Sequence, residues 1–220
     1  MISLFKLLRF LGPTLLFFGT FVVLPPLALS YFNNIPDAQL LNIYLGCIAY
    51  SIVIFFTLRQ RKFSYSPKDG FVITFLTWVI ISLLASLPFQ NANMVFYDAL
   101  FEAVSGLTTT GSTVIKDLSL FPDHILLYRQ LLQWAGGVGL VIVVLAIIPA
   151  VSGGMKVLQA ETSGFADKSF SPRLRETARS LLKFYALITI ACVFSYWLVG
   201  MTWFEAFSHS FSTVSIGGFS

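Results

Sequence analysis

Two short clusters of residues combine hydroxyl side chains with glycine, and each follows a short helix-forming segment. The first cluster is Thr108-Thr109-Thr110-Gly111-Ser112, and the second is Ser215-Ile216-Gly217-Gly218-Phe219. Hard monovalent cations take oxygen ligands, and backbone carbonyls can replace the hydration shell of such an ion. Glycine permits backbone conformations that turn a carbonyl toward an ion and that residues with a Cβ rarely adopt. The two clusters are therefore candidate binding loops for a dehydrated cation.

The segment before the first cluster is too short to cross a membrane. As a helix, Val95 to Leu107 would be about 20 Å long, whereas a hydrocarbon core is about 30 Å thick. Non-helical backbone at that depth is tolerated only where protein encloses it or where it lines a watery cavity. The segment therefore predicts a re-entrant pore loop, in which the negative end of the helix dipole favours a cation. Taken alone, it equally supports an ordinary helix end with glycine at the C′ position.

A second copy of the pattern strengthens the pore-loop interpretation. It lies at a constant offset of 107 residues, as between Gly111 and Gly218. The same offset pairs Asp98 with Glu205, Ser105 with Ser212 and Thr108 with Ser215. Repetition of acidic start, hydroxyl end and glycine in one register indicates one structural unit used twice.

The composition is that of an integral membrane protein. The chain is 56% hydrophobic and 11% charged, against about 25% charged residues in a typical soluble domain. Cys47 and Cys192 lie in apolar runs and predict no disulfide framework. The sequence contains no nucleophile–base pair, metal cluster or nucleotide fingerprint. It therefore predicts a protein that is not an enzyme and that holds no cofactor in this chain.

Five long apolar runs alternate with polar segments. The predicted spans are Leu7–Leu29, Leu40–Leu58, Phe71–Leu87, Ile125–Ile148 and Leu181–Val199. We expect an all-α membrane fold built from helix–pore loop–helix repeats. Residues 1–62 would form two N-terminal transmembrane helices and 63–150 the first repeat. Residues 151–180 would form a cytoplasmic basic loop, and 181–220 the start of a second repeat.

The basic residues predict the orientation. Of the 14 lysines and arginines, only Lys116 and Arg129 fall on the side that carries the pore loops. The positive-inside rule then places the N-terminus in the cytoplasm and both loops outside. The same asymmetry explains the net charge of +4 as a feature of topology, with contact to anionic lipids, rather than as a nucleic-acid footprint.

Three polar residues beside the clusters are candidate supports for the loops. Glu102 lies deep in the first short helix, where an ionisable group is a functional hypothesis by default, and His209 occupies the matching position in the second. We expect both to hydrogen-bond and hold the loops. For Arg129, snorkelling to the outer interface and bracing the loop from behind are alternatives of equal weight. Asp98 and Glu205 could concentrate cations at the outer mouth, but we expect them to complement the helix dipoles.

Three segments carry a resemblance to a known family. They read LTTTGSTV at 107–114, YRQLLQWAGG at 128–137 and SHSFSTVSIGGFS at 208–220. These segments resemble the Trk/Ktr potassium-uptake family, in particular its TrkH/TrkG membrane subunit. The similarity runs over essentially the whole chain.

The resemblance implies four fused helix–pore loop–helix units around one pore in the bacterial inner membrane. Gly111 and Gly218 would be the filter glycines of the first two units, and potassium, the substrate, would bind through Thr109, Thr110, Ile216 and Gly217. The family also implies a homodimer and a cytoplasmic nucleotide-binding ring, TrkA. This chain departs from the family pattern, because it holds only the first unit and the front half of the second. We therefore expect an N-terminal part of a longer protein.

A secondary transporter, coupled to sodium or protons, is the main alternative. Its broken helices would also create half-spans near the midplane, but it would predict inverted repeats, whereas both units here share one orientation. On the cytoplasmic side, Arg175, Arg179 and Lys183 recur every four residues and form a basic stripe. This stripe is a candidate contact for the cytoplasmic ring, and equally a determinant of topology and lipid contact.

The topology can be tested by cysteine labelling. Single cysteines at Asn34, Ser119 and Met201 should react with an impermeant thiol reagent added outside, whereas cysteines at Ser64 and Ser163 should not, because the basic segments stay inside. The parent chain, with only Cys47 and Cys192, is the control and should remain unlabelled. Reversed labelling would place the pore loops in the cytoplasm.

Overall fold

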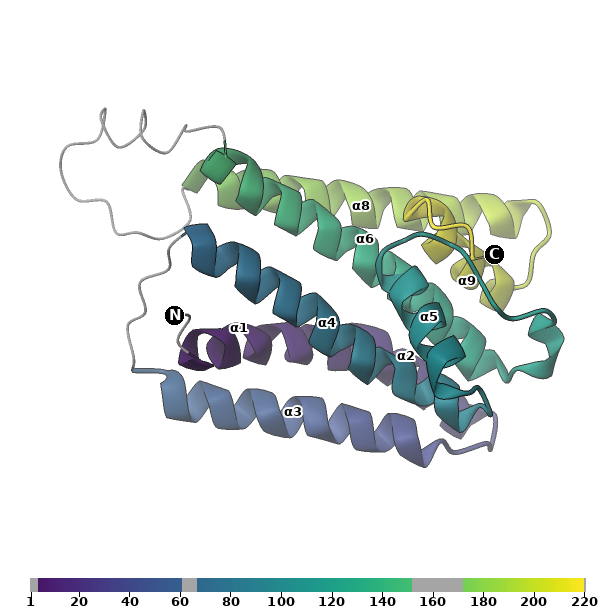
Figure 1. Cartoon of the computed structure of the whole chain (residues 1–220). Coiled ribbons are helices and arrows are strands. Elements are labelled where there is room, and N and C mark those ends of the chain that lie inside the picture. The colour runs from purple at the N-terminus through teal and green to yellow at the C-terminus, as the bar shows by residue number, and fades with distance from the viewer. Residues whose placement is uncertain (1–3, 61–66, 152–171, 220) are drawn as a thin grey trace.

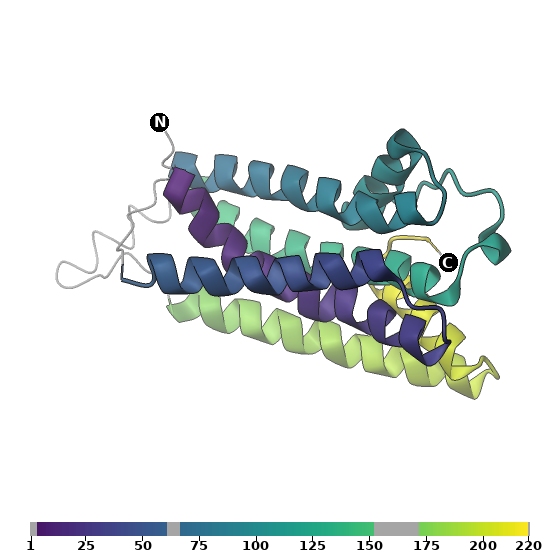
Figure 2. The same cartoon turned by 90° about the horizontal axis from the view of Figure 1, so that it is seen from below.

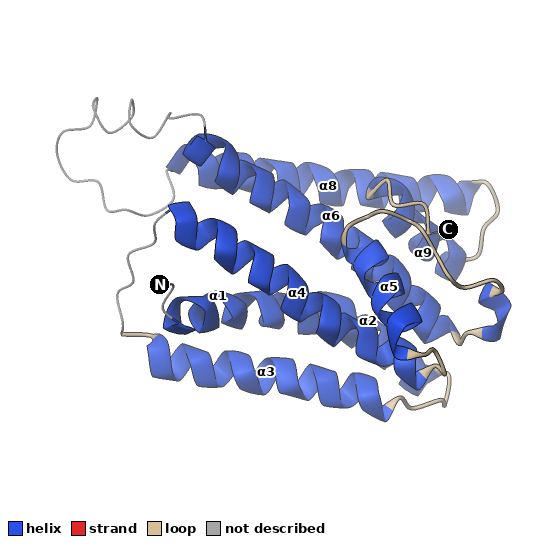
Figure 3. Cartoon of the chain, in the orientation of Figure 1, coloured by secondary structure: helices blue, strands red, loops and turns tan. Residues whose placement is uncertain are grey.

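The computed structural model describes residues 4–60, 67–151 and 172–219; of residues 67, 68, 140–151 and 172–175 it describes the backbone only. In these ranges every regular element is a helix (Figures 1 and 3). The elements are α1 (Leu4–Phe17), the π-helix η1 (Phe18–Val23), α2 (Leu24–Phe32), α3 (Ala38–Leu58), α4 (Pro67–Asn91), α5 (Phe96–Leu107), the 3₁₀ turn η2 (Leu118–Leu120), α6 (Asp123–Val151), α8 (Pro172–Leu198) and α9 (Trp203–Val214).

Four helical stretches among the described residues are long and apolar enough to cross a membrane. They are Leu4–Phe32, Ala38–Leu58, Asp69–Asn91 and Glu176–Leu198, and they cover four of the predicted spans. The remaining predicted span, Ile125–Ile148, lies within the 29 residues of α6, which is about 44 Å long. By contrast, α5 and α9 have 12 residues each and reach only about 18 Å. The predicted division into full spans and half-spans is confirmed.

The prolines of the first and third spans lie within helices. Helix α1 continues through Pro13, and the π-helix η1 joins it to α2, whose first turn holds Pro25 and Pro26. Proline lacks an N–H, and here the N–H of Leu24 bonds to Gly19 O, five residues back. The third span likewise continues through Pro88 to Asn91. Only one turn follows Pro88, so the missing hydrogen bond does not end the helix.

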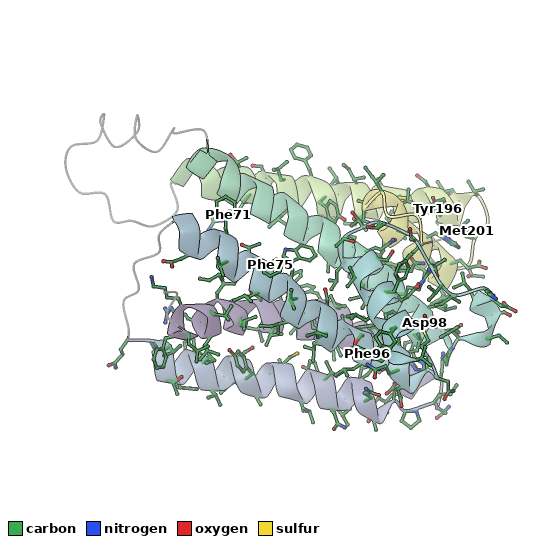
Figure 4. The ribbon with its side chains drawn as sticks, viewed as in Figure 1. Phe71, Phe75, Phe96, Asp98, Tyr196 and Met201 are labelled. Carbon is green, nitrogen blue, oxygen red and sulfur yellow. The ribbon has the colours of Figure 1, made fainter. Side chains whose placement is uncertain are left out.

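The two short helices lie at the same end of the bundle. The chain runs along α4 to this end and enters α5, and it runs along α8 to the same end and enters α9 (Figures 1 and 2). Asp98 and Met201 lie at this end, while Phe71 lies toward the other (Figure 4). At the opposite end Lys6 forms an ion pair with Asp69 at 2.7 Å, and Arg9 donates to Leu58 O. The two helix–loop units therefore share one orientation.

Close packing against α6 fixes the position of α5. Ala99 and Ala103 are fully buried, and Gly136 of α6 lies so near the end of α5 that an added Cβ would stand 2.0 Å from Leu107 O. Tyr128 is also fully buried and donates to Ala85 O of α4 at 3.1 Å. The small residues let the backbones approach closely, as in other membrane helix pairs. Gly136 is thus the glycine of α6 at which the backbone of α5 comes closest.

A buried polar cluster ties the N-terminal helices to the first repeat. Asp37, only 7% exposed, caps α3 by accepting from the N–H groups of Gln39 at 2.9 Å and Leu40 at 3.1 Å. It also accepts from Asn91 Nδ2 of α4 at 3.1 Å and lies 3.5 Å from His124 Nε2 of α6. Burial raises the pKa of the Asp37 carboxyl, but hydrogen bonds from His124 and these donors outweigh it, and the pKa is lowered. One carboxylate therefore joins α3, α4 and α6.

We expect Asp37→Ala to lower the free energy of unfolding in detergent by about 1–2 kcal/mol, because the helix loses its cap and buried donors lose their acceptor. Since the folded pKa lies below its ordinary value of 3.8, the contribution is complete above that value and is lost as the pH falls through the lowered pKa. Thermal unfolding from pH 3 to 7 measures this. The control is Asp117→Ala, which removes the cap of the exposed turn η2 and should change unfolding little. Equal effects of the two variants would contradict the role of Asp37.

Candidate ion-binding loops and their support

The two short helices end in the same pattern of backbone hydrogen bonds. After α5, Thr109 N donates to Gly106 O at 3.0 Å and Thr110 N to Ser105 O at 2.9 Å. After α9, Ile216 N donates to Thr213 O and Gly217 N to Ser212 O, both at 3.0 Å. Each donor and acceptor is displaced by the same 107 residues that relate Gly111 to Gly218. The repeat inferred from residue types therefore extends to the backbone.

The backbone of both loops alternates between negative and positive φ. Thr109 and Gly111 have φ of 55° and 77°, and Ile216 and Gly218 have φ of 57° and 76°, whereas the residues between them are not in the positive-φ region. In an extended strand, successive residues face opposite sides. Alternation in the sign of φ departs from this extended pattern and lets successive carbonyls face one side. A β-branched residue at positive φ is a genuine outlier, and such strain clusters at functional sites.

The carbonyl oxygens of the loops fall into two groups. Those of 108–111 and 215–218 accept no hydrogen bond from any described residue. The last carbonyl of each loop is bonded to protein: Ser112 O accepts from Ser105 Oγ at 2.6 Å, and Phe219 O accepts from Arg129 Nη1 at 2.6 Å. Four successive carbonyls in each loop are therefore free to ligate, whereas the fifth is held from behind.

The two loops approach each other closely. A Cβ added at Gly111 would stand 1.7 Å from Gly217 O, whereas nothing lies within 4 Å of the corresponding position at Gly218. Both glycines have a positive φ, which residues with a Cβ adopt at a cost. Gly111 thus has two physical reasons to be glycine, and Gly218 has one among the described residues.

A buried ion pair lies behind the loops. Glu102 of α5 is fully buried and Arg129 of α6 is 1% exposed, and Arg129 Nε lies 2.5 Å from Glu102 Oε1. Glu102 also accepts from Thr113 Oγ1 at 3.0 Å and from Val114 N at 3.3 Å, directly after the first loop. Glu102 is the counter-charge of Arg129, and it therefore reduces the repulsion between the guanidinium and a cation near the loops. Arg129 does not snorkel, and of the two alternatives the structure favours bracing.

The guanidinium of Arg129 also reaches the second loop. Besides donating to Phe219 O, it stacks on the Phe219 ring, with 3.6 Å between Cζ and the ring centroid. Gln130 and Gln133 of the same helix contact the Phe219 backbone, through Nε2 to O at 3.3 Å and through Oε1 to N at 3.3 Å. One face of α6 therefore contacts the second loop directly, and it reaches the segment after the first loop through Glu102.

The remaining predicted residues lie at varying distances from this arrangement. Asp98 and Glu205 stand in the first turns of α5 and α9, and Glu205 forms a capping box with Thr202. His209 makes no side-chain hydrogen bond to a described residue; its ring lies edge-on to Tyr196, at 6.3 Å between centroids. The expected hydrogen bonding is therefore observed for Glu102 but not for His209.

Two contributors were missed by the sequence reasoning. Thr113, which bonds Glu102, lies just beyond the predicted cluster, and Ser105 anchors the end of the loop through Ser112 O. The pairing of Ser105 with Ser212 marked this serine as part of the repeat but gave no indication of its partner. No signal in the sequence singled out Thr113 from the hydroxyl residues around it.

Comparisons with known proteins agree with this architecture. The model of the TrkH family, described as "Cation transport protein", matches residues 37–220. The "Trk system potassium uptake protein TrkH" of Halomonas elongata is 41% identical over 99% of this chain, and that of Vibrio parahaemolyticus is 39% identical over 98%. The "Trk system potassium uptake protein TrkG" of Escherichia coli K12 is 37% identical over 90%.

A solved structure matches the fold as well. The "Crystal Structure of the Potassium Transporter TrkH from Vibrio parahaemolyticus" superposes with a TM-score of 0.79 at 37% identity, over 99% of this chain and 44% of that one. The chain spans 46%, 45% and 42% of the lengths of the three relatives, so it is less than half as long as these proteins. It is a multi-pass, all-α membrane protein with re-entrant pore loops, and it belongs to the TrkH family.

Proposed function

We propose that the chain is the N-terminal part of a potassium-uptake protein and supplies two of the strands that line its ion filter. The observation that carries this proposal is the pair of loops in which φ alternates in sign and four successive carbonyls accept no hydrogen bond from a described residue. Such carbonyls can replace the hydration shell of a potassium ion. The relatives are named as Trk system potassium uptake proteins, which supports potassium as the substrate and transport rather than enzymatic chemistry.

The proposed ligands are the backbone carbonyls of two strands. They come from Thr108, Thr109, Thr110 and Gly111 in the first loop, and from Ser215, Ile216, Gly217 and Gly218 in the second. Ser112 and Phe219 end the strands, and we assign their carbonyls to anchoring, because both already accept short hydrogen bonds from the protein. Glu102 and Arg129 act as filter support, and His209 takes the corresponding position in the second unit with an aromatic contact.

The alternative of a secondary transporter with broken helices receives less support. That architecture is built from repeats of inverted topology. Here α4 with α5 and α8 with α9 run in the same sense (Figure 1). Coupling of potassium entry to sodium or protons within a channel-like pore is compatible with this geometry.

The location and partners follow from the same proposal. We infer a bacterial inner-membrane protein with a cytoplasmic N-terminus and with the loop-bearing end of the bundle outside, since the N-terminal parts of α1 and α8, which carry Lys6, Arg9, Arg179 and Lys183, lie toward the other end. We also infer a homodimer, bound on the cytoplasmic side by a nucleotide-binding ring of the TrkA type. The basic stripe at Arg179 and Lys183, in the N-terminal half of α8, is the surface that would meet this ring or anionic lipid.

Substitution of the filter glycines tests the proposal. In the full-length protein, Gly111→Ala should lower the preference for rubidium and potassium over sodium about tenfold or more, because Gly217 O blocks the new methyl and φ is positive. Gly218→Ala should have a smaller effect in the same direction. Rubidium uptake with and without competing sodium, normalised to protein in the membrane, measures both.

Gly139→Ala of α6 is the control, because its Cβ would make an ordinary contact of 3.6 Å with Trp78. Gly137 is less suitable, since a Cβ there would stand 2.6 Å from Tyr185 Oη and 3.3 Å from Ser215 Cβ. Unchanged affinity and ion preference in both filter variants would overturn the assignment of the loops.

The support role of the buried ion pair has a separate test. Glu102→Gln should cost about 3–5 kcal/mol, because the Arg129 charge remains buried without its counter-charge. Adding Arg129→Gln removes that charge, and the double variant should be more stable than the single one. A double-mutant cycle of thermal unfolding in detergent gives the coupling, expected to exceed about 1 kcal/mol. Additive effects would mean that the two residues act independently.

A further inference from the structure

The two loops are anchored in different ways although their backbones match. In the first unit the anchor is the unit's own short helix, because Ser105 Oγ of α5 donates to Ser112 O at 2.6 Å. The matching serine of α9, Ser212, is fully buried, and its Oγ has no partner among the described residues. The matching carbonyl, that of Phe219, is instead bonded to α6 of the first unit. The second loop is therefore held by its neighbour.

The contact is made on both sides of the Phe219 residue. Its carbonyl accepts from Arg129 Nη1 at 2.6 Å and from Gln130 Nε2 at 3.3 Å. Its N–H donates to Gln133 Oε1 at 3.3 Å. The carbonyl thus has two donors, whereas the N–H depends on Gln133 alone. Among the described residues, Gln133 is therefore the one side chain that accepts from the Phe219 N–H.

Gln133 also fills the space behind the preceding residue. Its side chain is fully buried, and a Cβ added at Gly217 would stand 2.4–2.5 Å from its Cδ, Nε2 and Oε1. The amide group therefore lies against the α carbon of Gly217. Gly217 does not have a positive φ, so it needs to be glycine for space rather than for conformation. In the first loop the matching residue is Thr110, which keeps its side chain and bonds Thr108 Oγ1 at 2.8 Å.

We propose that Gln133 is a positioning residue that sets the second filter strand, by bonding Phe219 N–H and packing against Gly217. The inference rests on the proposed function, since it concerns the same loops. The selectivity of the strand in the second unit would then depend on a residue of the first unit. Gln133 touches no ion in this arrangement; it acts through the carbonyls of 216–218, whose positions follow from the fixed Phe219 peptide and the contact at Gly217.

Substitution by residues of similar size separates positioning from bulk packing. In the full-length protein, Gln133→Leu should lower the preference for rubidium over sodium about fivefold, the factor that one net hydrogen bond of ordinary strength carries. Gln130→Leu is the matched control, because Arg129 still bonds Phe219 O, and it should change the preference less than twofold. Rubidium uptake against competing sodium, normalised to protein in the membrane, is the readout.

A second pair of variants tests the contact with Gly217 even if Gln133→Leu accumulates poorly. Gly217→Ala should strongly reduce the amount of folded protein, because the methyl group collides with the Gln133 amide. In a Gln133→Ala background the collision is gone, and Gly217→Ala should reduce folded protein at least severalfold less. Equal losses in both backgrounds would overturn the proposed contact.

The outcomes also separate this inference from the proposed function. If Gly111→Ala alters ion preference but Gln133→Leu does not, the positioning role is wrong while the filter assignment stands. If neither variant alters it, the filter assignment itself fails. A change in both, with Gln130→Leu near the parent protein, supports the proposal.

Discussion

The buried ion pair of Glu102 and Arg129 is the interaction on which the loop region depends. Two charges removed from water cost several kcal/mol each unless they are paired and their remaining donors and acceptors are used. Here the carboxylate accepts hydrogen bonds from the Thr113 hydroxyl and the Val114 N–H, and the guanidinium donates one to the Phe219 carbonyl. The hydrogen bonds that complete the pair therefore fix both the segment after the first loop and the end of the second loop. A planar guanidinium, with five donors in a fixed fork, suits this bridging better than a lysine would.

The short helices meet a second constraint, the close approach of backbones. Gly136 brings α6 against the last carbonyl of α5, and Gly106 of α5 lies against the Phe219 ring, with 3.2 Å from an added Cβ to the nearest ring carbon. A larger residue at Gly136 would displace the end of α5, where the first loop starts, and one at Gly106 would displace the Phe219 ring at the end of the second loop. Packing at these glycines and the ion pair act together, because Arg129 lies on the same helix as Gly136. The positions of the free carbonyls thus follow from helix packing and from a buried charge pair, rather than from the loops alone.

Local features were predictable from the sequence, and contacts between distant segments were not. Half-span length, the register of 107 residues and the need for glycine at Gly111 follow from residue types within a few turns. The partners of Arg129 lie 27 and 90 residues away, so no local pattern distinguished bracing from snorkelling. Thr109 and Ile216 at positive φ contradict local preference, since β-branched residues avoid that region. Proline is a further case, because its missing N–H favours a helix end, whereas α1 continues through Pro13 and α4 through Pro88.

The repeat shows which properties of a unit are copied with its backbone and which are not. Helix length, hydrogen bonds at the helix end and the alternation of φ recur in both units, because the local sequence determines them. The anchors differ. Glu102 accepts hydrogen bonds from the chain after the first loop, whereas the matching His209 contacts the ring of Tyr196. Ser105 donates to Ser112 O, whereas the matching Ser212 hydroxyl has no partner among the described residues. Anchors are tertiary contacts, and each loop meets a different set of neighbours around the pore. Two loops with one backbone conformation can therefore hold their carbonyls with different stiffness, so equivalent substitutions in them need not have equal effects.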